Sequence, residues 1–331
     1  MSDEPIPAVG LPLAARAPGK CILFGEHAVV HGRPELVLAI DLPVQVGIRE
    51  RSPGRLNGDP NGATTNPYYR AALEQFWTDG PSLEVRVNSR VPRAAGLGSS
   101  AAFSAALAAG LSAARGGTSR RELAERAFWI ERTAQGVGSP GDTAAAVGGG
   151  YLSLNAPGGA EVFQFSDGDR SWTARRVPDP SWSWVVAYSG LPRSTADAVR
   201  AVGRRLAEPD GPALLDAFQH VAEAGIAGVR AEDRTAVGRC LDENHELLTK
   251  VGVSHPRLES LLEAARPAIV GGKLTGAGAG GSIVVLPQPG RELDAARRIA
   301  RAGGLPFVVR PEPRGASLVE AAAETPVDPE A

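Results

Sequence analysis

The chain has 331 residues, of which 43% are hydrophobic and 22% are charged, the balance of an ordinary globular protein. At about 150 residues per domain, this length predicts two domains. The 35 Lys and Arg residues are offset by 37 Asp and Glu residues, which gives a formal net charge of −2. A chain without a basic excess lacks the cations that bind a phosphate backbone, so nucleic acid is not expected as a partner.

The cysteines and the apolar runs bear on the cellular compartment. Two cysteines, Cys21 and Cys240, are too few for a disulfide framework and indicate a reducing compartment. The longest weakly polar run, residues 101–114, is shorter than the about 20 residues that span a bilayer. The first residues also lack the basic and apolar regions of a signal peptide. We therefore expect a soluble cytoplasmic protein without a membrane partner.

In chain order, the residue patterns predict alternating strands and helices between loose ends at residues 1–14 and 311–331. The expected strands are residues 16–24, 35–50, 83–87, 182–188 and 282–286. The expected helices are residues 101–111, 121–135 (ended by Gly136), 195–206, 213–250 and 256–268. A Pro-, Asp- and Ser-rich stretch at residues 177–183 predicts a boundary between domains at 15–180 and 181–310.

The segment PRAAGLGSSA, residues 92–101, lies between a predicted strand and a predicted helix. Glycines allow successive backbone N–H groups to turn toward one point, and a helix N-terminus adds about half a positive charge. Ser99 and Ser100 could cap the helix or place a hydroxyl group on a metal ion. The segment therefore indicates either a phosphate-binding loop or a plain turn between a strand and a helix.

Two common nucleotide-binding motifs can be tested against the sequence. The P-loop pattern Gly-x-x-x-x-Gly-Lys-Ser/Thr occurs nowhere in the chain. Residues 276–281 match the dinucleotide fingerprint Gly-x-Gly-x-x-Gly, which requires a helix after it. Because residues 282–286 predict a strand instead, a nicotinamide dehydrogenase is disfavoured.

The segment APGKCILFGEHAVVHG, residues 17–32, places a lysine, an acid and an imidazole around one turn. Glu26 and His27 could simply be a surface pair of that turn. However, only three of the 35 basic residues are lysine, and Lys20 and Lys273 both lie in glycine-rich segments. A compact ammonium group suits a phosphate or a nearby carboxylate where the planar arginine fork does not fit.

Two acidic residues further along the chain are candidate functional groups. Glu131 falls within the apolar face of a predicted helix, where a carboxylate is costly unless it is paired or bound to a metal ion. Arg126 or Arg132 could supply that pairing. Asp142 follows eleven residues later, in a turn between Gly and Thr where a capping aspartate is common.

Taken together, three motifs resemble those of the mevalonate kinases, members of the galactokinase, homoserine kinase, mevalonate kinase and phosphomevalonate kinase superfamily. The motifs are PGKCILFGEHAVVHG, GLGSSA and KLTGAGAGG, in the family's order across residues 17–286. The resemblance implies an α+β fold with an N-terminal nucleotide-binding domain, a C-terminal ferredoxin-like domain and an active site in the cleft between them. It also implies that ATP and Mg²⁺ are used to phosphorylate the 5-hydroxyl group of mevalonate.

The resemblance further implies a role for each residue that matches a family motif. Asp142 would accept the proton of the substrate hydroxyl group, and Lys20 would stabilise the developing charge. Ser100 and Glu131 would hold Mg²⁺. The nucleotide would be bound by Gly96, Leu97, Gly98, Ser99, Ser100, Gly276, Ala277 and Gly278, and mevalonate by Glu26, His27, Arg193 and Thr195.

The sequence departs from the family pattern at two places. The segment SPGDT, residues 139–143, resembles archaeal rather than eukaryotic members, and Glu35 replaces the small residue that is usual after Pro34. Two alternatives stay open: a related kinase that acts on phosphomevalonate or another small hydroxy acid, and a nucleotide-binding regulator without catalysis. The joint presence of the four implied catalytic and metal-binding residues argues against the regulator. The sequence leaves the choice between a monomer and a homodimer open.

Overall fold

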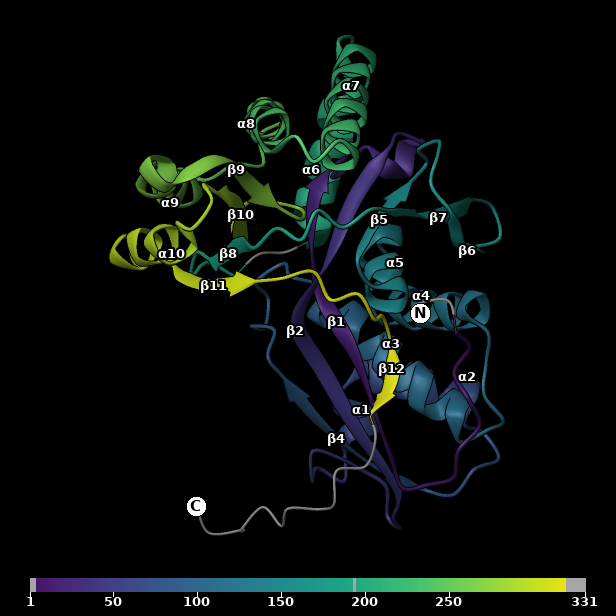
Figure 1. The fold of residues 1–331 in the computed structure, drawn as a ribbon. Helices are drawn as coiled ribbons and strands as arrows, with labels where there is room; N and C mark the ends of the chain where they lie inside the picture. Colours follow the sequence, from purple (N-terminus) through teal and green to yellow (C-terminus); the bar gives the residue numbers. More distant parts are fainter. Residues whose placement is uncertain (1–3, 193–194, 320–331) are drawn as a thin grey trace.

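The computed structural model describes residues 4–192 and 195–319, with the backbone alone at residues 195–197. The chain forms two sheets, visible in Figure 1. The strands of the larger sheet are β1 (Leu13–Phe24), β2 (Glu35–Glu50), β3 (Arg55–Leu56), β4 (Leu83–Ser89), β5 (Tyr151–Leu154), β6 (Glu161–Ser166), β7 (Ser171–Val177) and β12 (Ser317–Val319). Those of the smaller sheet are β8 (Trp184–Tyr188), β9 (Ile269–Thr275), β10 (Ser282–Pro287) and β11 (Leu305–Val309).

The helices include two short 3-10 turns. These turns are η1 (Val29–His31) and η2 (Arg266–Ala268). The α-helices are α1 (Gly62–Thr65), α2 (Pro67–Phe76), α3 (Ser99–Ala113), α4 (Arg120–Gln135), α5 (Pro140–Gly148), α6 (Thr195–Leu206), α7 (Gly211–Arg230), α8 (Arg234–Lys250), α9 (Pro256–Ala265) and α10 (Glu292–Arg301).

Strand β2 is the centre of the larger sheet, because it is paired along both of its edges. The strand order is β12-β1-β2-β5-β7-β6, with β4 also paired to β2 and β3 paired to β4. On one side β1 runs antiparallel to β2, while on the other β5 pairs with residues 35–38 and β4 with residues 44–50. The first six residues of β2 are all buried. A strand that is covered on both faces is typically a continuous apolar run, and Glu35 is a buried charged residue at the start of this one.

Helices α3 and α5 pack against β1 and β2, and α4 packs against both helices. Residues 101–113 of α3 are all buried, and their small side chains allow the helix to lie at the centre of the domain. Helix α4 begins with a capping box formed by Ser119 and Glu122 and ends at Gly136, whose φ of 77° is left-handed. The predicted end of this helix is therefore confirmed.

The smaller sheet has the order β11-β8-β10-β9, with every pair antiparallel. Helices α8, α9 and α10 pack against it. The glycine-rich segment 276–281 joins β9 to β10 as a hairpin, so a strand follows the dinucleotide fingerprint, as predicted. Strand β7 belongs to the larger sheet and β8 to the smaller one, and we propose on this basis that the domain boundary lies near residue 180.

Two of the predicted features differ in the structure. The helical stretch expected over residues 213–250 is divided into α7 and α8, because Glu232 adopts a left-handed φ of 54° and Asp233 caps α8. No glycine or proline marks this break. The ends of the described chain are tied to the fold rather than loose. Ile6 is buried and exchanges two backbone hydrogen bonds with Thr118, and β12 pairs with β1.

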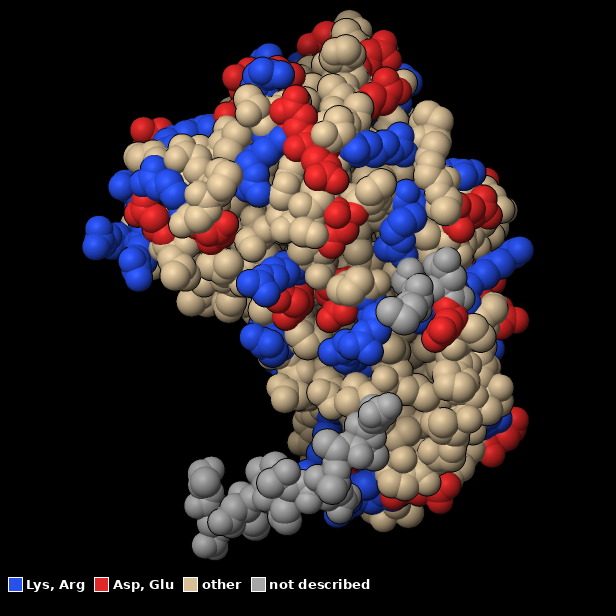
Figure 2. All heavy atoms as spheres, in the orientation of Figure 1, with Lys and Arg blue, Asp and Glu red and all other residues tan. Residues whose placement is uncertain are grey.

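The surface is mixed in charge on the face that Figure 2 shows. Acidic and basic side chains are interspersed there, and neither sign forms one continuous patch. Of the helices in residues 4–192 and 195–319, none combines the length and the apolar character that a bilayer crossing requires.

Candidate active site

Two neighbouring cavities are lined by the segments that the sequence singled out. The first cavity, of about 760 Å³, is lined by the glycine-rich loop before α3 and by residues from α2, α3 and β4. The second cavity, of about 470 Å³, is lined by the turn after β1, by α4, by the start of α5 and by the β9–β10 hairpin. Ser100, Gln135 and Val137 line both cavities. Two molecules bound in the two cavities would therefore lie next to one another.

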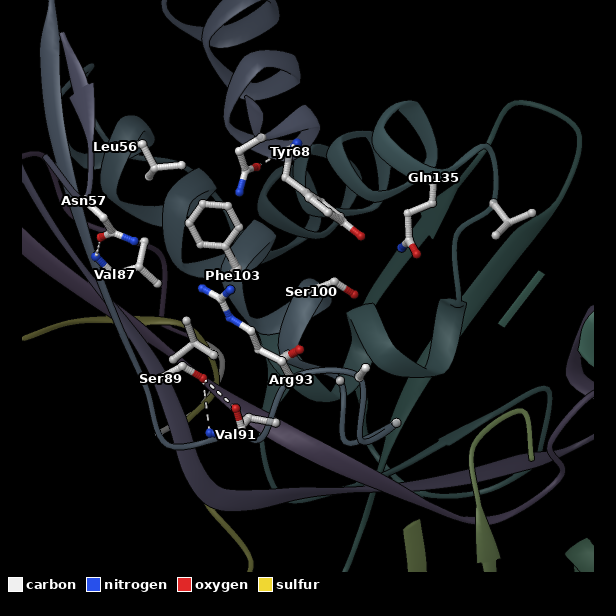
Figure 3. Close-up of a pocket in the computed structure, with 17 residues that line it drawn as sticks. Leu56, Asn57, Tyr68, Val87, Ser89, Val91, Arg93, Ser100, Phe103 and Gln135 are labelled. Atoms are coloured by element: carbon white, nitrogen blue, oxygen red, sulfur yellow. Dashed lines mark hydrogen bonds between the residues drawn. The ribbon is translucent and has the colours of Figure 1, made fainter. Parts of the chain in front are cut away.

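In the first cavity, the glycine-rich loop leads directly into the N-terminus of α3. Gly98 is the N-cap of this helix, and no side chain caps it. The structure therefore gives neither Ser99 nor Ser100 the capping role that the sequence left open. Figure 3 shows the hydroxyl groups of Tyr68 and Ser100 directed toward the side of the cavity where Gln135 lies. An uncapped helix N-terminus beside a polar cavity suits an anionic ligand.

The glycine-rich loop requires a glycine at position 98, because this position lies against the side chain of Lys20. Gly98 has a φ of 75°, and a Cβ atom added there would come within 2.8 Å of Cγ of Lys20. The Nζ group of Lys20 donates a hydrogen bond to the carbonyl oxygen of Gly96 at 3.3 Å. Leu97 is fully buried, and its carbonyl oxygen accepts from the backbone N–H of Lys20. The loop and β1 are thus fixed to one another through Lys20.

The same lysine side chain reaches Asp142. Nζ of Lys20 lies 2.9 Å from Oδ1 of Asp142, and the exposed fractions of the two side chains are 2% and 18%. Asp142 is in the first turn of α5, where Ser139 is the N-cap. Oγ of Ser139 accepts from the Asp142 N–H group and donates to Oδ1 of Asp142 at 2.8 Å. The Asp142 carboxylate is therefore held in one orientation at the edge of the second cavity.

Glu131 is buried on the inward face of α4. Its carboxylate accepts hydrogen bonds from the hydroxyl groups of Ser100 at 3.4 Å and Ser104 at 3.3 Å, and from the amide group of Gln135 at 2.9 Å. Burial, followed by the charge of Asp142, raises the pKa of Glu131 to about 8. All three hydrogen-bond partners are neutral, so among the described residues no cation forms an ion pair with the Glu131 carboxylate.

Neither arginine that could pair with Glu131 does so. Arg126 donates to the hydroxyl group of Ser112, and Arg132 pairs with Asp167. The alternative explanation of Glu131 as half of a salt bridge is therefore excluded. Within residues 4–192 and 195–319, no group of three or more His, Cys, Asp or Glu side chains forms a ready-made metal site.

Glu26 and His27 lie in the turn after β1 and line the second cavity. Glu26 forms a short buried ion pair with Lys273 from β9, while its Oε2 atom has no hydrogen-bond partner. His27 has a left-handed φ of 63°, and its Nε2 atom lies 3.1 Å from the carbonyl oxygen of Ala277. Both side chains therefore connect this turn to the β9–β10 hairpin of the smaller sheet, Glu26 through Lys273 and His27 through Ala277.

The hairpin residues lie on a different cavity from the one expected. Gly276 and Ala277 line the second cavity, whereas the sequence assigns them to the nucleotide with the glycine-rich loop. Gly278 packs against Val253. The hairpin does adjoin the loop, because the Ser282 hydroxyl group donates to the carbonyl oxygen of Ala95 at 2.7 Å.

Two of the predicted acceptor-binding residues cannot be placed. Arg193 lies outside the described residues, and only the backbone of Thr195 is described, at the start of α6. Their assignment to the acceptor stays a prediction.

Several residues that line the cavities carry no motif and were not predicted. In the first cavity these include Asn57, Tyr68 and Phe103, labelled in Figure 3. In the second cavity one such residue is Glu35, for which the only signal was a charged residue at a position that is usually small.

Comparison with known proteins identifies the class. The model of the GHMP kinases N terminal domain matches residues 66–150, and that of the GHMP kinases C terminal domain matches residues 226–304. The fold is accordingly that of a two-domain small-molecule kinase of the GHMP type, as predicted.

Sequence relatives narrow the class to one family. The chain is 31% identical to the mevalonate kinase of Pyrococcus horikoshii, over 92% of this chain and 97% of that relative. It is 32% identical to the mevalonate kinase of Methanothermobacter thermautotrophicus, over 82% of this chain and 89% of that relative. The chain belongs to the mevalonate kinase family.

Solved structures agree with this fold. A structure of L. major mevalonate kinase in complex with R-mevalonate superimposes with a TM-score of 0.75 at 22% identity, covering 95% of this chain and 100% of that one. Lactococcus lactis galactokinase complexed with galactose gives a TM-score of 0.73 at 16% identity, covering 93% of this chain and 95% of that one.

Proposed function

We propose that this protein transfers the γ-phosphoryl group of ATP to the 5-hydroxyl group of mevalonate, giving 5-phosphomevalonate and ADP. The observation that carries the proposal is the position of Lys20. Its ammonium group contacts Gly96 of the first cavity at 3.3 Å and Asp142 of the second at 2.9 Å. A phosphoryl group that passes from one cavity to the other would pass beside this cation. The mevalonate kinase family of the chain supports the choice of acceptor.

The first cavity suits ATP. Its glycine-rich loop and the N-terminus of α3 offer backbone N–H groups and a positive helix end to the phosphate groups. The rings of Tyr68 and Phe103 form an apolar wall beyond the loop, where a base could lie. Of the predicted nucleotide contacts, this proposal keeps Gly96, Gly98, Ser99 and Ser100, which line the cavity.

The residues present fit a magnesium ion. Glu131 is a buried carboxylate whose described partners are neutral, and the Ser100 hydroxyl group beside it lines both cavities. Carboxylate and hydroxyl oxygens are ligands that Mg²⁺ accepts together with phosphate groups and water. We propose that these two residues hold the ion, which when bound neutralises charge on the nucleotide phosphates.

At the acceptor, the proposed roles follow from charge and position. The Asp142 carboxylate acts as the base that accepts the proton of the attacking hydroxyl group. Its hydrogen bond with Ser139 holds it in one orientation for this step. The Lys20 ammonium group stabilises the developing alkoxide and the charge of the transferring phosphoryl group. Glu26 and His27 form the acceptor wall, and Arg193 and Thr195 remain predicted contacts.

The test is ADP release from ATP and Mg²⁺ with mevalonate, phosphomevalonate, homoserine and galactose in parallel. We expect turnover with mevalonate alone. Turnover with phosphomevalonate instead would support kinase activity but would contradict mevalonate as the acceptor. ATP binding without turnover on any of the four would favour a regulator.

A further inference from the structure

Glu35 is a buried carboxyl group in the wall of the second cavity. It is the first residue of β2, and its side chain is 1% exposed. Its Oε2 atom has no hydrogen-bond partner. The strand around it is otherwise apolar, since the next five residues, LVLAI, are all buried. A polar atom that is buried without a partner costs stability, so its presence calls for an explanation.

The chain makes room for this carboxyl group in α5. A Cβ atom added at Gly141 would come within 2.1 Å of Oε2 of Glu35 and within 2.9 Å of Cγ1 of Val37. Gly141 directly precedes Asp142, so the Glu35 carboxyl group lies against the backbone that carries the proposed proton acceptor. The Glu35 carboxyl group therefore occupies a space that depends on glycine at position 141, next to Asp142.

The charges around Glu35 do not balance. The groups that face it are Lys20 from β1, Glu26 from the turn after β1, Asp142 from α5 and Lys273 from β9. Lys20 pairs with Asp142 and Lys273 pairs with Glu26, so each cation already has its own carboxylate. Glu35 is the third acid among two cations.

The surroundings of this unpaired third acid favour its neutral form. Burial, followed by the charges of Asp142 and Glu26, raises the pKa of Glu35 well above its usual range, and the two lysines offset only part of this effect. A neutral carboxyl group carries an O–H donor. Oε2 is buried against Gly141, but the Glu35 side chain lines the second cavity, so the contents of that cavity are what a donor on its other oxygen atom, Oε1, can reach.

We propose that Glu35 is an acceptor-binding residue that stays protonated at neutral pH and donates a hydrogen bond to an oxygen atom of the acceptor in the second cavity. The inference rests on the proposed function, because it takes the occupant of that cavity to be the phosphoryl acceptor. An acceptor that is itself a carboxylate would gain twice from a neutral Glu35, through the hydrogen bond and through the absence of a repelling charge.

The proposal has a defined pH dependence. As the pH rises through its raised pKa, Glu35 loses its proton and becomes an acceptor-only carboxylate beside Asp142 and Glu26. The KM for the acceptor should therefore rise at alkaline pH, while the KM for ATP, bound in the first cavity, should stay constant.

The experiment compares the wild-type chain with Glu35→Gln and Glu35→Ala between about pH 6 and pH 10. Gln is permanently neutral and keeps a donor at nearly the same place. We expect Glu35→Gln to have a KM for mevalonate near the wild-type value at neutral pH and to keep it at alkaline pH, where the wild-type value rises. Glu35→Ala should raise the KM about tenfold at neutral pH, the loss of one hydrogen bond, with kcat changed much less.

Glu84→Gln is the matched control, because Glu84 is also a buried glutamate of the larger sheet, but it pairs with Arg49 and lines neither cavity. Its KM values and their pH dependence should follow the wild type. If the pH dependence of wild type and Glu35→Gln coincide and Glu35→Ala keeps the wild-type KM, Glu35 is only a wall residue and the inference is overturned. A fall in kcat at constant KM in both variants would overturn it as well.

The failure of this inference can be told apart from that of the proposed function. Mevalonate turnover by the wild type with no effect of Glu35 variants refutes the inference alone. Absence of turnover with every acceptor refutes the proposed function. In that case calorimetric titration of mevalonate into the wild type and Glu35→Ala, without nucleotide, still decides the role of Glu35, because equal heats and affinities would refute it.

Discussion

Lys20 is a single side chain on which both cavities depend. Its position against Gly98 explains a glycine of the loop, its bond to Gly96 fixes that loop, and its ion pair orients Asp142. An arginine could supply the charge but not the shape, because its planar fork is wider than an ammonium group. At the residue scale the site therefore requires a lysine.

Replacing either member of the pair should abolish turnover without preventing nucleotide binding. For Asp142→Asn we expect kcat to fall by at least about 10²-fold, since the amide group cannot accept the proton. Lys20→Arg should cause a loss of similar size, because the larger group meets the loop at Gly98. Steady-state kinetics, with nucleotide affinity from equilibrium titration, gives both values.

Lys250→Arg is the control for Lys20→Arg, because Lys250 is an exposed lysine at the end of α8. It should leave kcat unchanged. Full activity in Lys20→Arg would show that charge alone suffices and would contradict the argument from shape.

How much of the site the sequence could reveal depends on whether a residue belongs to a local motif. Lys20, Ser100, Glu131 and Asp142 stand in or near recognisable segments, and the structure brings Lys20 to Asp142 and Ser100 to Glu131. Tyr68 and Phe103 meet only through the packing of α2 on α3, with ring centroids 6.4 Å apart, so no local pattern could reveal them.

At the scale of elements, the short helix α5 sets the position of Asp142. Ser139 caps the helix, Pro140 begins it, and Gly141 lets it approach β2 closely. The long elements were predictable because their period or their caps are local, as for β2 and α4. The division of α7 from α8 was not, since a left-handed Glu232 leaves no mark in the composition.

Gly141→Ala tests the close approach of α5 to β2. The added methyl group would overlap with Glu35 and Val37, so we expect the free energy of unfolding to fall by about 1–3 kcal/mol. Because the helix must shift, kcat should fall as well. Chemical denaturation and steady-state kinetics measure the two effects.

Gly47→Ala in β2 is the matched control, because a Cβ atom there would meet nothing within 4 Å. It should change neither stability nor kcat appreciably. Combining Gly141→Ala with Glu35→Ala should recover part of the lost stability, since the nearest overlapping atom is removed. A double variant that is no more stable than Gly141→Ala would assign the strain to Val37 instead.

At the scale of the whole molecule, the two sheets are joined by buried polar contacts behind the second cavity. The N–H group of Ile22 in β1 donates to the Thr275 hydroxyl group at 2.8 Å, and that hydroxyl group donates to the carbonyl oxygen of Ile22 at 3.0 Å. Beside them, Lys273 of β9 pairs with Glu26, and both side chains are almost fully buried. The proposed acceptor wall and the junction between the sheets therefore share Glu26.

Lys273→Met should destabilise the whole molecule, because it leaves the buried Glu26 carboxylate without a counter-charge. The expected loss is about 3–5 kcal/mol in the free energy of unfolding. Replacing both partners, as Glu26→Gln with Lys273→Met, removes the unpaired charge, so the double variant should be more stable than Lys273→Met alone. Urea denaturation of the wild type, the two single variants and the double variant gives the free energies of unfolding for this double-mutant cycle.

The readout is stability and not activity, because Glu26 belongs to the proposed acceptor wall and its replacement would also affect turnover. Additive losses in the double variant would mean that the pair contributes no coupling and that the sheets are held together by their apolar contacts.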